Sequence, residues 1–404
     1  MKSPARLAAV FAALVLCSYL SAASTAHHVT IAAATADRLA LTGEFTLPPG
    51  APSPAQLRDS AGHTSPLQIE ANGQARFLIP DLRAGQTLAL TLVTGTSAGS
   101  GVNLTRTKSD LGINVGDRAA LVYQTDKEKL PRTDIDVRFK RAGYLHPVLS
   151  PAGAVVTGNF PSNHVHHHGI WSSWSKVQFQ GRATNFWETI EQKGNTEFLG
   201  IERSWNGPVH GGFVARQQMV DFTGPKSTPA INESWEVTTW RVEGVSPAAR
   251  VFDLLITQEA TTSDPVVMPK NLYGGTSFRG RDEWNGKDNL VVLTSEGATT
   301  RETANMTRVR WCYFGGAVEG GGSAGIAMLS HPGNLSAPQP IRVHPDMPYV
   351  CFAPVQLGDV RIESGKPYTA RYRFVVADGA PDRARLDAYW NSLAHPAIVT
   401  VDAK

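Results

Sequence analysis

The sequence has few cysteines, no long apolar run after its first twenty residues and no stretch dominated by charge of one sign. Only three cysteines occur in 404 residues. Cys17 lies in the apolar N-terminal stretch, so one disulfide at most, between Cys312 and Cys351, is open to an exported chain. Buried free thiols are equally common in large cores, and the sequence leaves both states open. The 38 basic and 35 acidic residues form no basic stripe, which argues against a nucleic-acid partner.

The N-terminus has the organisation of a secretory signal. Lys2 and Arg6 supply positive charge, residues 7–20 are apolar, and small residues at 21–26 offer a cleavage site. No other apolar run approaches the roughly 18 residues that a membrane-spanning helix needs. We therefore expect residues 1–26 to be a signal peptide and the mature protein to be exported, to the periplasm or beyond, with no membrane span.

Helix is scarce, and the sequence has no βαβ alternation, glycine-rich phosphate loop, Gly-x-Ser-x-Gly nucleophile turn or internal repeat. Short apolar or alternating segments separated by turn residues predict an all-β fold. Residues 27–115 contain no tryptophan and predict a small β-sandwich, whereas residues 116–404 contain all nine tryptophans and predict a large antiparallel β-sandwich. One helix is expected over residues 382–394, where Asp382 caps an apolar stripe.

Four of the twelve histidines fall between positions 164 and 168. If this stretch is extended, His164, His166 and His168 share one face and His167 lies on the other. Imidazole acts as an acid or a base near neutrality and is the commonest metal ligand. The cluster therefore predicts a functional site, although a surface run of histidines without function is the alternative.

Ten short segments after residue 140 carry a resemblance to a known family. They occur in order at 141–147, 164–171, 185–187, 211–213, 232–236, 273–275, 278–280, 293–297, 331–332 and 353–354. Together they closely resemble a bacterial family of exported proteins labelled "methane oxygenase PmoA". The resemblance implies a large twisted sandwich similar to that of galactose mutarotase, a scaffold used to epimerise, cleave or eliminate sugars.

The family usually has His-Pro-His-His-Arg-Gly where this chain has residues 164–169. Val165 and His168 depart from that pattern. The histidines of the family type are therefore His164, His166 and His167.

Sugar chemistry needs a proton donor and a proton acceptor on either side of a reacting carbon. We expect the catalytic groups to be the family-type histidines with a carboxylate and a further histidine from other strands, namely His164, His166, His167, Glu233 and His331. An ion pair with an arginine is the structural alternative for Glu233. The expected substrate-binding residues are aromatic rings for stacking, histidines beside strand ends or glycines, and one arginine: Trp171, Trp174, Trp187, His210, Tyr273, Arg279 and His344.

A metal site is the competing use of the same residue types, with His164, His166 and Glu233 as ligands. The sequence identifies no cofactor and no oligomeric state. It favours an exported protein that acts on a carbohydrate or glycoside by epimerisation, hydrolysis or elimination. A noncatalytic carbohydrate-binding protein and a metal-dependent oxidoreductase, which the family label suggests, remain the alternatives.

Overall fold

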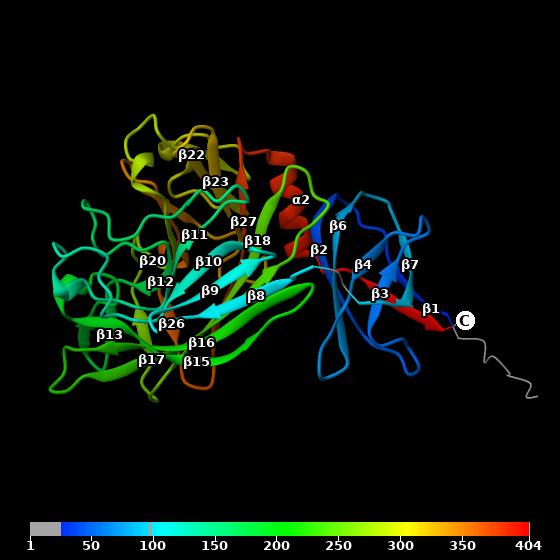
Figure 1. Cartoon of the computed structure of the whole chain (residues 1–404). Coiled ribbons are helices and arrows are strands. Elements are labelled where there is room, and N and C mark those ends of the chain that lie inside the picture. Colours follow the sequence, from blue (N-terminus) through cyan, green and yellow to red (C-terminus); the bar gives the residue numbers. More distant parts are fainter. Residues whose placement is uncertain (1–25, 97–98, 404) are drawn as a thin grey trace, which may run out of the picture.

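The computed structural model describes residues 26–96 and 99–403, and the expected signal segment lies, but for Ala26, outside them. The described chain is all-β with two α-helices, α1 (Arg301–Ala304) and α2 (Arg383–Ala394), and its named strands pair antiparallel. The expected architecture of two β-sandwiches with a C-terminal helix is confirmed. Figure 1 shows the small sandwich on one side of the molecule and the large one on the other.

Two sheets form the small sandwich. The five-stranded sheet has the order β28 (Val399–Ala403), β1 (His27–Ile31), β7 (Leu88–Thr94), β3 (Ala55–Arg58) and β4 (Thr64–Pro66). The three-stranded sheet has the order β2 (Arg38–Thr46), β6 (Gln74–Leu82) and β5 (Gln68–Ile69). Alternate apolar side chains of both sheets, Phe45 and Phe77 among them, make their common core.

Two eight-stranded sheets form the large sandwich. The first has the order β24 (Ile341–Val343), β25 (Tyr349–Phe352), β20 (Gly274–Arg279), β12 (Ile170–Trp174), β11 (Tyr144–Val148), β10 (Arg118–Gln124), β9 (Asp110–Val115) and β8 (Val102–Arg106). The second has the order β15 (Gly194–Trp205), β16 (His210–Asp221), β17 (Thr228–Trp240), β18 (Ala249–Ala260), β27 (Tyr368–Asp378), β23 (Ser323–Ser330), β22 (Trp311–Ala317) and β21 (Val291–Thr294). The largest apolar core contains side chains from both sheets.

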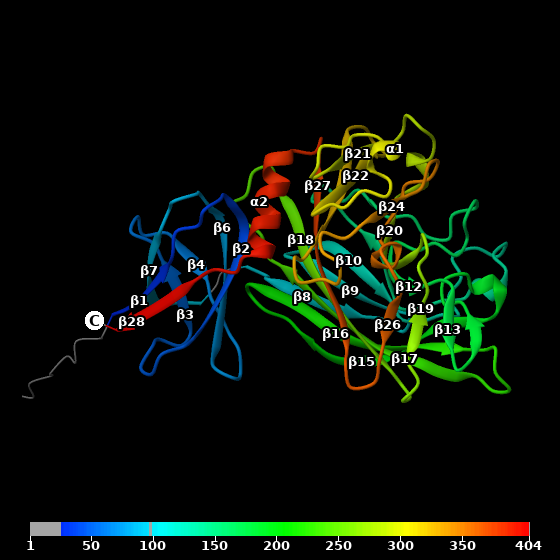
Figure 2. The ribbon, with the colours of Figure 1, turned by 180° about the vertical axis from the view of Figure 1, so that it is seen from behind.

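A four-stranded sheet extends the large sandwich at its end away from the small one (Figures 1 and 2). Its order is β14 (Arg182–Thr184), β13 (Val177–Phe179), β19 (Val266–Met268) and β26 (Val360–Ile362). A second core joins it to the loops around β12 and is rich in aromatic rings, with Trp171, Trp174 and Trp187 among its members.

The strand pairing crosses the domain boundary expected near residue 115. β8 and β9 precede that boundary but pair into the first sheet of the large sandwich, and β9 pairs with β10 across it. The last strand, β28, returns to pair with β1 in the small sandwich. Both ends of the described chain therefore belong to the small sandwich, and the large sandwich begins at β8.

Helix α2 lies between the two sandwiches, as Figures 1 and 2 show from opposite sides. Its Asp382 side chain accepts a hydrogen bond from the backbone N–H of Arg385, as the sequence predicts. The helix buries Leu386, Tyr389 and Leu393 in a core shared with β2 and β17.

Cys312 and Cys351 are buried and free. Among the described residues, no helix combines the length and the apolar character needed to cross a membrane.

Candidate functional site

The histidine cluster lies in a loop of consecutive turns before β12. The backbone N–H of His164 donates to the carbonyl of Pro161 (3.1 Å), and that of His167 donates to the carbonyl of His164 (2.9 Å). The stretch is therefore not extended, and the alternation of an extended chain does not apply. The turns bring His164, His166 and His167 together and direct His168 elsewhere, where its ring stacks on Tyr144 at 4.4 Å between centroids.

A histidine from a distant segment joins this loop. The ring centroid of His164 lies 5.6 Å from that of His166 and 5.6 Å from that of His344, which follows β24. The ring of His167 lies 4.6 Å from that of His166 and 5.0 Å from that of His164. Two chain segments about 180 residues apart thus place four imidazoles in one group, which we call the histidine pocket.

The histidine pocket has a volume of about 350 Å³, within the range usual for small-molecule sites. Its aromatic wall is made by Trp187, Tyr273 and Tyr349, with ring centroids 6.0–6.3 Å apart. The other lining residues are mostly polar: Ser175, Lys176, Asn185, Glu188, Glu191, Asn271 and Leu272. An aromatic wall with hydrogen-bonding groups opposite suits a ligand that has both an apolar face and hydroxyl groups.

Burial keeps the imidazoles of the histidine pocket neutral. It lowers the pKa of His166 to about 4, with help from His164, and lowers the pKa of His344 to about 4 as well. Burial also lowers the pKa of His164, and the positive charge of the nearby Arg279 guanidinium lowers it further. The pKa of His167 lies well below its usual value, mainly because the ring is buried. Neutral imidazoles can accept protons and donate hydrogen bonds at neutral pH.

Glu188 is the carboxylate nearest to the histidine loop. Its Oε1 lies 4.0 Å from Nε2 of His166, beyond direct hydrogen-bonding distance. Burial, with repulsion from Glu191, raises the pKa of Glu188. The second acid of the pocket, Glu191, is neutralised by Lys193 at 2.8 Å. Glu188 is therefore the acid of the pocket that lies near His166 and has no cationic partner among the described residues of this pocket.

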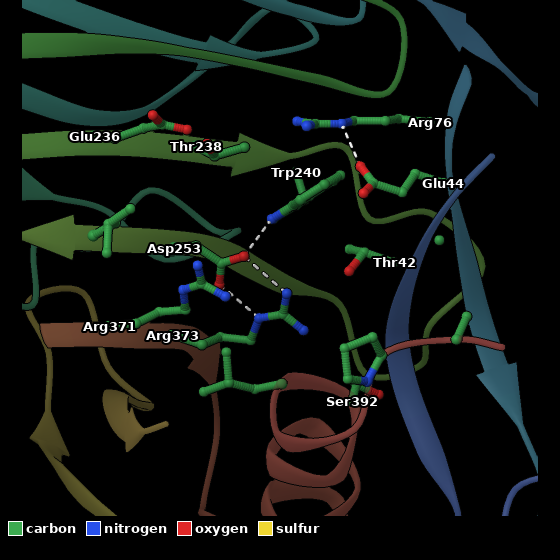
Figure 3. Close-up of a pocket in the computed structure, with 15 residues that line it drawn as sticks. Thr42, Glu44, Arg76, Glu236, Thr238, Trp240, Asp253, Arg371, Arg373 and Ser392 are labelled. Carbon is green, nitrogen blue, oxygen red and sulfur yellow. Dashed lines mark hydrogen bonds and ion pairs between the residues drawn. The ribbon is translucent and has the colours of Figure 1, made fainter. Parts of the chain in front are cut away.

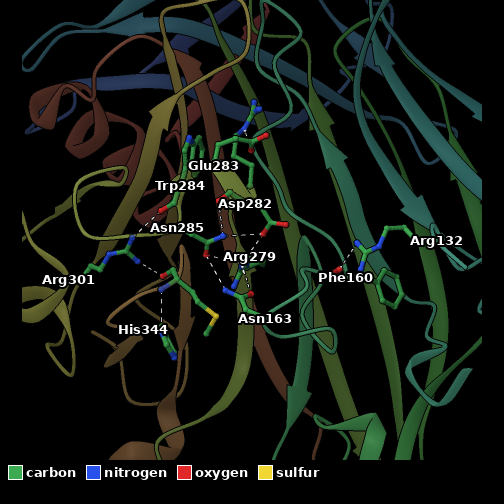
Figure 4. Close-up of polar contacts among 12 residues, drawn as sticks. Arg132, Phe160, Asn163, Arg279, Asp282, Glu283, Trp284, Asn285, Arg301 and His344 are labelled. Carbon is green, nitrogen blue, oxygen red and sulfur yellow. Dashed lines mark hydrogen bonds and ion pairs between the residues drawn. The ribbon is translucent and has the colours of Figure 1, made fainter. Parts of the chain in front are cut away.

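Arg279 lies beneath the histidine loop and does not line the pocket. Its Nη2 donates to Asn163 (3.2 Å), Asp282 (3.0 Å) and Asn285 (3.2 Å), as Figure 4 shows. The guanidinium is fully buried. Arg279 thus holds the loop and raises the local positive potential, which differs from the substrate contact that we expected.

Of the three tryptophans expected to form a stacking wall, Trp187 alone lines the pocket. Trp171 is fully buried behind it, with its ring 5.3 Å from those of Trp187 and His167. Trp174 is also fully buried, and its Nε1–H donates to Gln258 at 2.8 Å. Both belong to the core that supports the wall.

Glu233 lies in a separate buried network between the sheets. Its two carboxylate oxygens accept hydrogen bonds from Gln217 (2.5 Å) and Gln258 (2.6 Å). Burial raises its pKa to about 7, against these bonds and the charge of Arg141. Glu233 does not line the histidine pocket, so the structure does not bring it to the histidines, and the ion pair considered as its alternative is replaced by two amides.

His331 and His210 lie away from the histidine pocket. His331 follows β23, where its Nδ1 accepts the backbone N–H of Gly333 at 3.0 Å. His210 is buried at the start of β16, where the indole N–H of Trp205 donates to its Nδ1 at 2.9 Å. The expected single pocket therefore contains neither residue.

A second cleft lies where the small sandwich, the second large sheet and α2 meet. We call it the junction cleft, and its volume is about 340 Å³. Figure 3 shows Asp253 bound there by Trp240 (2.9 Å) and by both ends of the Arg373 guanidinium (2.7 and 2.9 Å). Another ion pair, Arg76 with Glu44, closes its far side. Its acidic groups are already paired, so none is free to act as a base.

Glu233 does not join His164 and His166, so the alternative metal site of these three residues is not formed. Within residues 26–96 and 99–403, no group of three or more His, Cys, Asp or Glu side chains has an arrangement that would hold a metal ion.

The sequence interpretation missed Glu188 and Tyr349. Glu188 directly follows the segment 185–187, which is one of the ten that carry the family resemblance. This adjacency was the signal that could have pointed to it. Tyr349 is buried in β25 and stacks on His167 at 4.8 Å between centroids, a contact that no local pattern predicts.

Comparisons with known proteins place most of the large sandwich in a family but assign it no activity. Residues 110–391 match the model of a family of unknown function (DUF6807). This match does not support the label of a methane oxygenase. No curated protein matches the chain. Among solved structures, the crystal structure of heparan sulfate lyase HepC from Pedobacter heparinus is 10% identical, covers 72% of this chain and aligns with a TM-score of 0.29. The chain spans 38% of that protein's length, and a similarity this low supports no statement about activity.

Proposed function

The chain belongs to the family of unknown function DUF6807, and we propose that it is an exported carbohydrate-active enzyme that transfers protons to and from a sugar in the histidine pocket. The observation that carries the proposal is the convergence of four neutral imidazoles and two carboxylates on a cavity of about 350 Å³ with an aromatic wall. These groups come from segments distant in the sequence and meet at one cavity.

The aromatic wall supports a sugar as the ligand. Trp187 and Tyr273 line the pocket, and the C–H face of a sugar ring packs on aromatic rings. Asn185, Asn271 and Ser175 supply amide and hydroxyl groups for its hydroxyls. The wall and these polar groups lie in one cavity, so one ring can contact both.

His166 and Glu188 support proton transfer. His166 is neutral at neutral pH and accepts a proton, and the carboxylate of Glu188, 4.0 Å away, stabilises the imidazolium that results. The other imidazoles, His164 and His167, lie within 6 Å of His166 between ring centroids. They are placed to return the proton to a different atom of the ligand.

The proposal is tested with the full mature chain and a panel of mono- and oligosaccharides that includes uronic acids and keto-sugars. Binding is measured by calorimetry and turnover by product analysis. His166→Ala is compared with His63→Ala, because His63 is exposed and lies in the small sandwich. Turnover lost in the first variant alone supports the proposal. Binding without turnover of any sugar would make the protein a noncatalytic binder and contradict the enzymatic part.

We also propose that the protein is exported, on the basis of the charged and apolar N-terminal segment. The mature chain is then expected to begin between residues 22 and 28. N-terminal sequencing of the protein from its native host tests this, and an intact Met1 would contradict it.

A further inference from the structure

The turn between β24 and β25 fixes how His344 uses its two ring nitrogens. Its Nδ1 accepts hydrogen bonds from the backbone N–H of Asp346 (3.1 Å) and of Met347 (3.3 Å). A backbone N–H only donates, so Nδ1 must present its lone pair. In a neutral ring the single proton therefore lies on Nε2, and His344 is a hydrogen-bond donor there.

Arg301 makes this turn rigid. Its guanidinium donates to the carbonyl of Met347, and also to the carbonyls of Trp284 (3.1 Å) and Gly286 (2.7 Å). The N–H of Gly286 in turn donates to the carbonyl of Asp346 at 3.0 Å. Figure 4 shows Arg301 above the turn and His344 below it. The backbone donors that select the tautomer of His344 are thus held before any ligand binds.

The surroundings keep the ring neutral. Burial, the neighbouring His164 and the guanidinium of Arg342 lower the pKa of His344 to about 4. A neutral Nε2–H donates to an oxygen lone pair but does not bind a metal ion through that nitrogen. The side of the pocket that His344 occupies is therefore complementary to an acceptor oxygen.

We infer that His344 donates a hydrogen bond from Nε2 to a carbonyl or carboxylate oxygen of the bound sugar, next to the carbon from which His166 removes a proton. This inference rests on the proposed function and narrows its substrate to sugars with a C=O beside a C–H, namely keto-sugars or uronic acids. A hydroxyl can accept the same hydrogen bond, but its oxygen takes up no negative charge when a neighbouring C–H loses its proton. An enolate oxygen, which has only lone pairs, gains most from it.

The reaction balances with groups already in the pocket. The C–H bond breaks, its proton moves to His166, and its electron pair forms the C=C bond of the enolate, whose oxygen charge is stabilised by the Nε2–H of His344. Return of the proton to the other face of the carbon gives an epimer. Loss of an oxygen substituent from the next carbon, with the proton going to that oxygen, gives elimination. Neither course needs an oxidant or a reductant.

The tautomer is tested without any ligand. Long-range ¹H–¹⁵N correlation spectra of the ¹⁵N-labelled full chain distinguish protonated from unprotonated ring nitrogens, and His344→Gln assigns the signals of His344. We expect an unprotonated Nδ1 and a protonated Nε2 from pH 7 down to about pH 5. A protonated Nδ1 in this range overturns the inference whether or not the protein acts on sugars.

The role in enolate formation is tested by hydrogen exchange in D₂O. A uronic acid, a keto-sugar and the parent sugar of each are incubated with the protein, and loss of the ¹H signal beside the carbonyl is followed by NMR. We expect exchange with a carbonyl sugar and none with its parent, and the probe that exchanges identifies the ketone or the carboxylate. His344→Phe, which cannot donate, should slow exchange by roughly 10²- to 10³-fold. His344→Gln, which keeps an N–H, should restore part of it, and His63→Phe should change nothing.

The outcomes separate this inference from the proposed function. Turnover of sugars that lack a carbonyl, unaffected by His344→Phe, overturns the inference and leaves the proposed function standing. If no sugar binds or reacts, the proposed function fails. Exchange with a carbonyl sugar that requires both His166 and His344 supports both.

Discussion

Two groups of buried polar residues in the large sandwich use the same chemistry in opposite ways. In the Glu233 network, both carboxylate oxygens are occupied by amide donors from neighbouring strands. In the histidine pocket, the Nδ1 of His167 is buried and has no hydrogen-bond partner among the described residues, and the rings around it face a cavity. A polar network whose bonds are complete stabilises a fold, whereas one with free bonding capacity at a cavity is available to a ligand. The comparison supports a structural role for the Glu233 network and the proposed role of the histidine pocket as a ligand site.

The largest effect is expected on turnover, when His166 is replaced by Ala. Turnover of a sugar that the wild-type protein processes should fall by roughly 10²- to 10⁴-fold, because a positioned acid or base contributes on that scale. Steady-state kinetics measure it, and circular dichroism checks the fold. If His166→Ala left turnover unchanged, as the His63→Ala control should, the histidine cluster would have a structural role, like Glu233.

Replacement of Glu233 should act on stability instead. Glu233→Leu leaves the amide donors of Gln217 and Gln258 buried without acceptors, and it should lower the free energy of unfolding by about 2–4 kcal/mol. Glu236→Leu on the same strand is the control, because it removes only a solvent-exposed pair with Arg203. Urea unfolding measures both. A variant that keeps its stability but loses sugar binding would place Glu233 in the site.

The two groups should also respond to pH with opposite sign. His166 has a pKa of about 6.5 when unfolded and about 4 when folded, so the folded state binds fewer protons and its stability falls as the pH drops from 6.5 to 4. Glu233 has a pKa of about 4.5 when unfolded and about 7 when folded, so its contribution is present at low pH and is lost as the pH rises from 4.5 to 7.

Substitutions that do not titrate should separate these effects. His166→Gln should weaken the loss of stability on acidification, by about 1–3 kcal/mol between pH 7 and pH 4. Glu233→Gln should make stability rise more steeply between pH 4.5 and pH 7. Urea unfolding at a series of pH values measures the slopes, and slopes that change in the same direction would contradict the assignment of the two groups.

The smallest effect is expected at His331, which lies outside both groups. His331→Ala should leave turnover unchanged and alter stability by no more than about 0.5 kcal/mol, because the ring is partly exposed and makes one hydrogen bond to its own turn. Kinetics and thermal unfolding measure these quantities. A loss of turnover as large as that of His166→Ala would mean that residues outside the histidine pocket take part in the reaction.

Local patterns predicted the fold class and the helix α2, and they singled out residues 164–168, three of whose histidines line a cavity. They succeeded because alternation, a capping residue and a cluster of one residue type are all properties of a short stretch of chain. Within residues 164–168, the three histidines of the family type line the pocket, while His168 packs on Tyr144.

Local patterns did not predict which distant residues meet. β28 pairs with β1 across most of the chain, and the register of β16, β17 and β18 places Glu233 between two glutamines. Both depend on pairing between strands, which no short stretch encodes. The turn that brings His344 to His164 is held by Arg301, a residue of α1. The pocket lining includes the predicted residues Trp187, Tyr273 and His344 as well as the loop histidines, whereas Glu188 and Tyr349 were missed.

The central claim is that the histidine pocket, and not the junction cleft or the Glu233 network, receives a sugar. The most direct test is to titrate the ¹⁵N-labelled full chain with the saccharide panel and follow the imidazole signals of all histidines. The account predicts that one class of sugar, at saturable concentrations, shifts His164, His166 and His344 and leaves His331 and His63 unmoved. Shifts at His331 alone, or no shift at the pocket histidines with any sugar, would contradict it.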